Sequence, residues 1–433
     1  MNKRNEIKTG YIQTEIGRIP KEWEVVELGT CIDVFSGYAF KREDFLTNKS
    51  KGVPIIKIGN LQNGKVIIDD KTSFVPRDFY EKLFDFQLHY GDVLIALSGA
   101  TTGKIAVVDK DIGLALVNQR VGKFKILNSN ISQKFFYFLA QSDNFKKFVL
   151  RNIGQSAQGN LSPNQVKKSK IPLPPLPEQQ KIAEILSTVD SAIEKVNQAI
   201  AKTERLKKGL MQELLTKGIG HKEFKDTEIG RIPKEWEVVR LESLINEVKN
   251  GFASGKRDEN GIVQIRMNNV TTDGLLILDS YLKVPVPDNV NDWILEDGDF
   301  LFNNTNSYDL VGKSTIFKGV PFPCTFSNHF TRIRFRNNLV LPEIILYHFL
   351  ILWEKGYFKS VAIRHVGQSA VHTKYLLKLK LPLPPLPEQK KIAEILSTVD
   401  KRLVLLRNKK EKMGRVKKGL MNDLLTGKRR VKV

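Results

Sequence analysis

Two stretches of this chain occur twice, and this repetition constrains its fold more than any other feature. Residues 14–28, TEIGRIPKEWEVVEL, return at 227–241 with 14 of 15 residues identical. Residues 171–190, IPLPPLPEQQKIAEILSTVD, return at 381–400 with 18 of 20 identical. The segments between the copies share almost no sequence. A chain that keeps its frame and varies its inserts is expected to fold as a scaffold that carries two different domains.

The composition is that of a globular protein without a membrane or metal signature. Hydrophobic residues make up 41% of the 433, enough for each half to bury a core. No run approaches the ~18 apolar residues of a membrane span, and the first residues lack the apolar region of a signal peptide. Cys31 and Cys324 form no CxxC pair, and the six histidines are scattered. We therefore expect a cytoplasmic protein with reduced thiols and no metal site.

The net charge of +22 points to a polyanionic partner, with DNA or RNA ahead of a membrane surface. The alternative is a solvated basic surface. Part of the excess is local, because residues 388–433 carry 15 Lys and Arg against 5 Asp and Glu. We interpret residues 428–433 as a basic, solvated tail. The rest of the excess lies mainly in the two inserts and their flanks.

Each repeated PLPPLPEQ run is expected to lead into a long helix. The prolines favour an extended approach, because proline fixes φ and donates no hydrogen bond. Pro177 suits a first helical turn, where Glu178 would place negative charge at the positive end of the helix dipole. An SH3-ligand interpretation of the PxxP spacing is less favoured, because a helix begins at once.

The segments 178–218 and 388–427 show apolar residues at heptad spacing. Each helix would run 38–40 residues, or ~60 Å. Two such helices in one chain most simply pair as a coiled coil, and the connectivity makes the pair antiparallel. The pair would separate the two inserts like a ruler in a pseudo-twofold frame. The predicted coiled-coil residues are Ile182, Ile185, Val189, Val196, Leu206, Leu210, Ile392, Ile395, Val399, Leu406, Met413 and Leu420.

Both inserts are predicted to mix strands and helices. Residues 51–69 read as strand, turn and strand around Asn63–Gly64, a hairpin signal. Residues 133–150 and 342–361 are helical in pattern, and GQSA comes after each of them, at 154–157 and 367–370. The expected fold class is α+β, with mixed domains at 14–177 and 227–387.

Catalytic motifs are not found. The loop from Gly99 to Lys104 is one residue short of a phosphate-binding GxxxxGK[ST] loop, and Ser307 stands where the other Gly-Lys loop needs its first glycine. No amino-methyltransferase, dinucleotide, zinc-protease or nuclease motif has suitable spacing. The chain is therefore predicted not to be an enzyme by itself.

The inserts instead offer amides, hydroxyls and cations in loops. Such side chains read base edges and hold phosphates, although each position is also compatible with a turn or capping role. Trp293 and Trp353 are assigned to the core. The candidates in the first insert are Lys57, Asn60, Asn63, Ser98, Thr101, Thr102, Lys104, Asn118, Gln119, Arg120, Gln155 and Gln158. Those in the second are Arg266, Asn268, Asn269, Asn303, Asn304, Asn306, Lys313, Asn328, His329, Arg332, Arg364 and His365.

The duplicated GRIPKEWE and PLPPLPEQ-to-helix blocks resemble the specificity subunit of type I restriction-modification systems, across the whole chain. The resemblance implies two pseudo-twofold-related target recognition domains separated by an antiparallel coiled coil. Each domain would read one half of a split, asymmetric double-stranded DNA target, and the helices would set the spacer. It further implies two modification subunits that use S-adenosylmethionine, and restriction/translocase subunits that use ATP and Mg. Unlike inserts imply unlike half-sites.

Three alternatives remain open from the residues. A self-sufficient nuclease or methyltransferase would need a catalytic motif. An independent DNA-binding scaffold or regulator would act without methyltransferase partners, which a partner pull-down would test. A protein-binding adaptor would not show salt-sensitive DNA binding.

Overall fold

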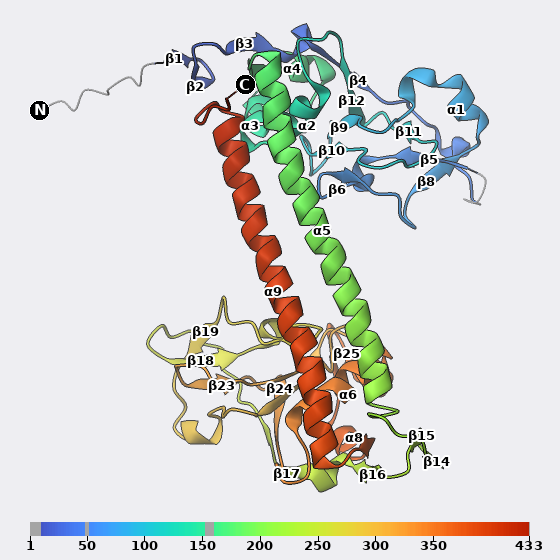
Figure 1. The fold of residues 1–433 in the computed structure, drawn as a ribbon, viewed down its shortest axis with the longest axis vertical. Coiled ribbons are helices and arrows are strands. Elements are labelled where there is room, and N and C mark those ends of the chain that lie inside the picture. Colours follow the sequence, from blue (N-terminus) through green and yellow to red (C-terminus); the bar gives the residue numbers. More distant parts are fainter. Residues whose placement is uncertain (1–9, 48–51, 152–159, 433) are drawn as a thin grey trace, which may run out of the picture. The chain divides into compact units, whose positions relative to one another are not determined.

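The computed structural model describes residues 10–47, 52–151 and 160–432, and it forms two compact units (Figure 1). The first unit comprises residues 1–197 and 408–433, and the second comprises residues 198–407. Among the described residues, no helix has both the length and the apolar character needed to cross a membrane.

The first unit opens with the repeated frame segment. Strands β1 (Tyr11–Thr14) and β2 (Gly17–Pro20) form a hairpin, and β3 (Glu24–Glu27) pairs antiparallel with β13 (Lys170–Leu173). The proline-rich lead-in is thus extended, as predicted, but its first part is a strand. Pro172 lies opposite Val25 in this pair. Among the described residues no third strand pairs with β13, so the N–H that proline lacks is not needed for further strand pairing.

The insert of the first unit folds on two sheets, with strand orders β4-β12-β9-β10-β7-β6 and β11-β5-β8. At the predicted hairpin, Asn63 has a φ of 52° and Gly64 a φ of 77°, the left-handed pair of a type I′ turn. The strands are β4 (Ile32–Ser36), β5 (Val53–Ile56), β6 (Leu61–Gln62), β7 (Lys65–Val66), β8 (Ser73–Val75), β9 (Val93–Ala96), β10 (Ile105–Val107), β11 (Leu116–Val117) and β12 (Val121–Ile126). The helices are α1 (Asp78–Lys82), α2 (Gln133–Gln141), α3 (Asp143–Arg151) and α4 (Pro163–Lys167).

The second unit repeats this plan on a different sequence. Its sheets have the orders β17-β24-β20-β22, β19-β18-β23 and β21-β26-β25, and β16 pairs with β27 as β3 does with β13. The strands are β14 (Phe224–Thr227), β15 (Gly230–Pro233), β16 (Glu237–Arg240), β17 (Ile245–Asn250), β18 (Ile262–Ile265), β19 (Leu282–Val284), β20 (Phe300–Asn303), β21 (Thr305–Asn306), β22 (Ser314–Ile316), β23 (Cys324–Phe326), β24 (Phe330–Phe335), β25 (Ile363–His365), β26 (Gln368–Ala370) and β27 (Lys380–Leu383). The helices are α6 (Pro342–Glu354), α7 (Tyr357–Val361) and α8 (Thr373–Leu377). The predicted fold class, α+β with two mixed domains, is confirmed.

The two long helices, α5 (Leu176–Leu214) and α9 (Leu386–Leu424), have 39 residues each. Each unit contains the N-terminal half of one and the C-terminal half of the other. In the first unit Asp190 binds Lys417 at 2.6 Å, and in the second Lys207 binds Asp400 at 2.6 Å. The paired positions descend along α9 as they ascend along α5, so the predicted antiparallel pairing is confirmed.

The buried seam between these helices differs in part from the predicted heptad rows. Leu206 is 53% exposed and Ile395 is 38% exposed, whereas Lys207 is buried in the seam. A straight helix has 3.6 residues per turn, so a strict row at 3.5 drifts by about 20° per heptad and leaves the contact. Among the other predicted contacts Ile182, Val196 and Ile392 are buried, and Ile185, Val189, Leu210, Val399, Leu406, Met413 and Leu420 are half-buried.

The repeated tryptophan and glutamate form the same contact in both units. The indole N–H of Trp23 donates to Glu178 at 2.9 Å, and that of Trp236 donates to Glu388 at 2.8 Å. Arg430 adds a two-bond fork to Glu178, at 2.7 and 2.9 Å. The interpretation of residues 428–433 as a solvated tail is therefore wrong for Arg430, because the buried carboxylate of Glu178 requires a cation or donors.

The repeated glutamine anchors each insert to its long helix. The amide oxygen of Gln179 accepts from the backbone N–H of Ser132, which caps the start of α2, at 2.8 Å. Gln389 accepts in the same way from Leu341, at the start of α6, at 2.9 Å. Each glutamine also donates to a carbonyl of its own proline run, on Pro174 or Pro384. The glutamine of the PEQ repeat thus connects the frame to the insert by hydrogen bonds in both units.

Candidate nucleic-acid interface

Most of the candidate DNA-reading residues of the first domain meet at one edge of its sheets. Strands β4 and β9 end there, and the antiparallel strands β12 and β10 begin there, with Ser36 opposite Gly122 and Ile95 opposite Ile105. The parallel strands β5 and β11 also end there, because the N–H of Asn118 donates to Ile56. We call the loops at this edge, residues 37–41, 57–60, 97–104 and 118–120, the first reading edge.

The side chains at this edge divide into exposed and structural ones. Thr101, Gln119 and Arg120 are exposed, whereas Asn60 and Asn118 are buried. Asn60 accepts from the N–H of Lys57 at 2.9 Å and donates to Ile67 and Thr72, so it holds its own turn. The half-buried candidates are Lys57, Ser98, Thr102 and Lys104.

Lys57 has an unusual environment for a surface cation. Its ammonium lies 4.1 Å from the ring centre of Phe45 and donates to Ser73 at 2.8 Å. Burial lowers its pKa from the ordinary value. Asn63 lies away from the edge, in the β6–β7 turn, where the carbonyl of Gly64 accepts from Val107. The candidates Gln155 and Gln158 lie outside the described residues.

The second domain forms the corresponding edge. Strands β17 and β20 end where β24 and β22 begin, with Asn250 opposite Thr331 and Phe302 opposite Ser314. The parallel strands β18 and β23 also end there. We call residues 251–258, 266–269, 304–313 and 327–329 the second reading edge.

Five candidates in the second domain are buried. The side-chain oxygen of Asn269 accepts a hydrogen bond from the backbone N–H of Arg266 at 2.9 Å, as that of Asn60 accepts from the backbone N–H of Lys57. Lys313 donates to the carbonyls of Met267 and Val270, and burial lowers its pKa. Because its ammonium already donates to these two carbonyls, Lys313 is not suited to bind a phosphate. The buried candidates are Asn269, Asn303, Asn306, Lys313 and Arg332.

The remaining candidates of the second domain are accessible, and Asn304, Asn328 and His329 among them lie close together. The side-chain amide of Asn304 donates to the backbone carbonyl of Asn328 at 3.4 Å. The backbone N–H of Asn304 donates to the backbone carbonyl of His329 at 3.0 Å. Burial and the charge of Arg266 lower the pKa of His329, so the imidazole is neutral near pH 7 and offers one donor and one acceptor. The accessible candidates are Arg266, Asn268, Asn304, Asn328, His329, Arg364 and His365.

A short hairpin, β25–β26, adjoins this edge and was only partly anticipated. β26 pairs with β21, which comes directly after Asn304, and the N–H of Val371 donates to Asn304 at 2.8 Å. Arg364 stacks over the ring of Tyr308 at 3.8 Å. Tyr308 and Val366 were not among the predicted candidates, because aromatic residues were assigned to the core and valine has no amide, hydroxyl or charge.

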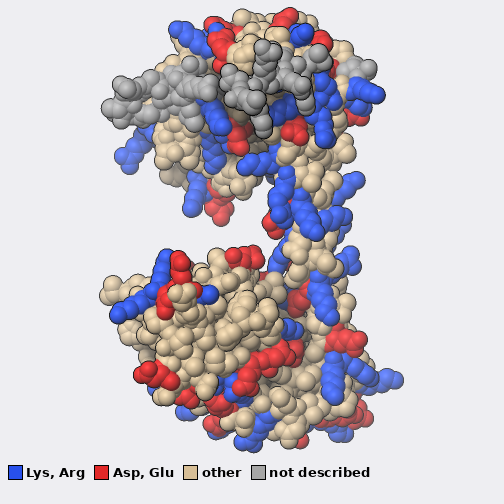
Figure 2. Space-filling view, turned by 90° about the vertical axis from the view of Figure 1, so that its left-hand side faces the viewer, with Lys and Arg blue, Asp and Glu red and all other residues tan. Residues whose placement is uncertain are grey.

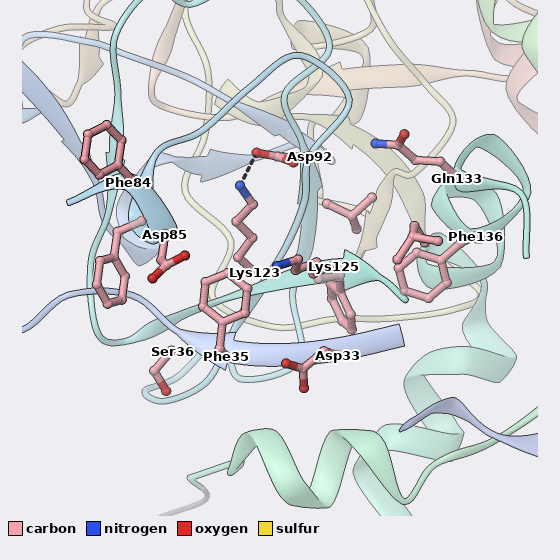
Figure 3. A pocket seen from close by; sticks show the side chains of 14 residues that line it. Asp33, Phe35, Ser36, Phe84, Asp85, Asp92, Lys123, Lys125, Gln133 and Phe136 are labelled. Atoms are coloured by element: carbon pink, nitrogen blue, oxygen red, sulfur yellow. Dashed lines mark ion pairs between the residues drawn. The ribbon is translucent and has the colours of Figure 1, made fainter. Parts of the chain in front are cut away.

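A hollow in the first domain is separate from the candidate readers. It measures about 640 Å³ and opens on the solvent face of β4 and β12 (Figure 3). Asp33, Asp85 and Asp92 line it, and Asp92 pairs with Lys123 at 2.8 Å. The three carboxylates outnumber the two lysines of the lining, Lys123 and Lys125, which disfavours a nucleic-acid phosphate there. None of the candidate residues lines this hollow.

Cationic side chains also lie along the long helices, as Figure 2 shows. Within the residues that the structure describes, no group of three or more His, Cys, Asp or Glu side chains is arranged to hold a metal ion. Cys31 and Cys324 are free and buried. The exposed cations of α9 are Lys390, Lys391, Lys401, Arg402, Lys409, Lys410, Lys412, Arg415 and Lys418.

Comparison with known proteins assigns the chain to a family. The family described as the type I restriction modification DNA specificity domain matches residues 20–205 and 233–413. The chain is 32% identical to the putative type I restriction enzyme MjaX specificity subunit of Methanocaldococcus jannaschii, across 98% of this chain and 97% of that one. It is 31% identical to the MjaVIII specificity subunit of the same organism, across 96% and 95%.

Solved structures agree on the fold. The S subunit of a type I restriction-modification system from M. genitalium superposes with a TM-score of 0.56 at 14% identity, covering 93% of this chain and 96% of that one. The chain therefore belongs to the type I restriction-modification DNA specificity family. It is a specificity subunit with two target-recognition domains, the non-catalytic component of such systems, and the resemblance predicted from the repeats is confirmed.

Proposed function

We propose that each domain reads one half of a bipartite, asymmetric double-stranded DNA target through its reading edge. The observation that supports this most is that both domains gather most of their accessible amide and cationic candidates at the same edge of equivalent sheets. Asn and Gln pair with adenine and Arg with guanine in the major groove. The two edges carry different residues, so the half-sites should differ.

The long helices are proposed to set the spacer and to dock two modification subunits. A groove of about 590 Å³ runs along α5 beside the start of α2. Its residues Glu184 and Thr188 recur as Glu394 and Thr398, which are also exposed. Repetition of exposed residues on both helices suits two copies of one partner. That partner would use S-adenosylmethionine, and restriction subunits would use ATP and Mg.

The first test is base-resolution methylation mapping in a host that lacks such systems. The chain would be expressed with its candidate modification subunit, and the modification subunit alone would serve as the control. We expect one split, asymmetric, adenine-methylated motif that depends on this chain. A soluble complex that produces no motif would contradict the proposal and favour an independent DNA-binding scaffold.

A second test separates the two readers. Exchanging residues 29–170 for the insert of another family member is expected to change only one half of the methylated motif. A change in both halves would contradict independent reading edges. Within one edge, Arg120→Ala should weaken only the first half-site, whereas Arg77→Ala, an exposed arginine beside α1, should leave the motif unchanged.

A third test addresses the spacer. Removing one heptad from both α5 and α9 should shorten the nonspecific gap and keep both half-sites, because each helix loses about 10 Å. An unchanged gap in a folded, active complex would contradict the role of the helices as a ruler.

A further inference from the structure

The tip of the β25–β26 hairpin combines an unpaired apolar side chain with a cationic, hydrogen-bonding surround. Its residues 363–370, IRHVGQSA, contain no acidic side chain. Val366 is fully exposed and Ile363 is exposed. A two-residue hairpin turn favours Asn, Asp or Gly, so the turn itself gives no reason for valine. Gly367, at a φ of 79°, supplies the turn, and open space surrounds it.

The base of the hairpin is held firmly while its tip projects. His365 pairs with Gln368 just below the turn, and Ser369, buried, pairs with Asn306 of β21. Arg364 is stacked on Tyr308 at 3.8 Å, which orients its guanidinium without an acidic partner. A rigid ribbon with an apolar tip and cationic flanks has the form of a groove-inserting element.

The sequence of this hairpin recurs in the first insert, although the inserts otherwise share almost nothing. Residues 364–370 read RHVGQSA, and residues 151–157 read RNIGQSA. Readers of different half-sites have no use for a shared base-discriminating motif. A shared motif suits a step that both half-sites undergo, independent of their sequence. Residues 152–159 lie outside the described residues, so the hairpin is considered only in the second domain.

We propose that the hairpin enters the DNA beside the second half-site and that Val366 wedges into a base-pair step and unstacks it. This inference rests on the proposed function. Adenine methylation by a partner subunit requires the target base to leave the stack, which costs less where a neighbouring step is already opened. Arg364 and Gln368 would hold the backbone on either side of the wedge.

The experiment uses the complete complex with its modification subunit, on duplexes that carry its methylated motif. Replacing each adenine in and beside the second half-site by 2-aminopurine reports unstacking as increased fluorescence. The wild-type complex should raise the signal at one step. Val366→Ala should lower that signal and slow methylation of this half-site by about tenfold, with the motif unchanged. Val366→Ile should behave as wild type.

Two controls sharpen the result. Val286→Ala removes another exposed valine of the same unit and should change nothing. A mismatch placed at the opened step should restore methylation by the Val366→Ala complex, because that step is already unstacked. Since Val366 is exposed and makes no core contact, its substitution should leave folding intact.

Three outcomes would overturn the wedge. If Val366→Ala leaves the fluorescence and the methylation rate unchanged, Val366 is not a wedge. If Val366→Ala changes the methylated motif, Val366 reads bases instead. Weaker binding of the modification subunit without DNA would assign the hairpin to a protein contact. If the wild-type complex produces no split motif, the proposed function itself fails, which is a distinct result from a normal motif with an inert hairpin.

Discussion

The two copies of the repeated frame form the same tryptophan–glutamate hydrogen bond, but the glutamate has a different additional partner in each copy. In both units the tryptophan of the IPKEW segment donates to the glutamate that begins a long helix. In the first unit that glutamate, Glu178, also binds Arg430 near the chain end. In the second unit Glu388 binds His221, in the segment that continues from α5 into the next domain. The repeat fixes the carboxylate, and the flanking segment supplies its partner.

A second difference comes from the inserts. The pair Asp400–Lys207 receives a hydrogen bond from the hydroxyl of Tyr347 at 2.9 Å, on α6. The equivalent pair in the first unit, Asp190–Lys417, has Phe138 beside it, which offers only a ring. Identical frame residues are therefore supported to different degrees by the domain that each copy carries. The comparison teaches that the frame tolerates unlike inserts because its tryptophan–glutamate contact and its lysine–aspartate pair form in both units, whichever insert each unit carries.

The largest expected effect is on the repeated tryptophans. Trp236→Ala should destabilise the second unit by about 3–5 kcal/mol, because it empties a fully buried site and removes the indole donor from Glu388. Trp23→Ala should do the same to the first unit. Hydrogen exchange followed by mass spectrometry would resolve the units. Equal loss of protection in both units from either substitution would contradict separate frames.

The ion pairs should respond unequally. Lys207→Met leaves Asp400 in a less exposed site than Lys417→Met leaves Asp190, since the pair exposures are 9% and 24% against 20% and 30%. We expect losses of about 3 kcal/mol and about 1 kcal/mol. Urea unfolding curves of the two variants would measure this difference. A reversed order would show that the tyrosine bond compensates for the lost lysine.

His348 makes the second unit acid-sensitive. Burial lowers its pKa to about 4 from the usual 6.5, so between these values the unfolded chain binds a proton that the folded chain does not. Stability should be complete above pH 6.5 and fall as the pH falls towards 4, by about 2 kcal/mol at pH 5.

The first unit supplies the control for this pH effect. Leu139 of the first unit is the equivalent of His348. It lies seven residues after Ser132, the N-cap residue of α2, and His348 lies seven residues after Leu341, the N-cap residue of α6. His348→Leu should therefore remove the acid sensitivity, measured as the pH dependence of thermal unfolding. A slope that persists in this variant would place the sensitivity in another group.

The smallest effect concerns the ends of the frame. Arg430→Ala removes the fork from the buried Glu178 and should cost about 1–2 kcal/mol, whereas His221→Ala removes one weaker partner from Glu388 and should cost less. Arg429→Ala is the matched control, because its only described bond is through the backbone. Thermal unfolding that responds equally to Arg429→Ala and Arg430→Ala would argue against a specific tail contact.

The sequence by itself determined the two-part plan, the two long helices, their antiparallel pairing and the family. Near-identical repetition and sustained helical periodicity are sequence signals, which need no knowledge of the fold. The Asn63–Gly64 turn was predictable for the same reason, because those two residues favour the left-handed backbone.

Only the tertiary structure decided which polar residues are accessible. Asn60, Asn269 and Lys313 resemble base readers in sequence, but the two asparagines are consumed by bonds within their own loops and Lys313 by carbonyls 43 and 46 positions away. It also turned Arg430 from a tail residue into a partner of Glu178, 252 positions away, and brought Val366 to a free tip. Burial and long-range pairing depend on how strands and helices meet, so spacing along the chain does not encode them in a form that can be read directly.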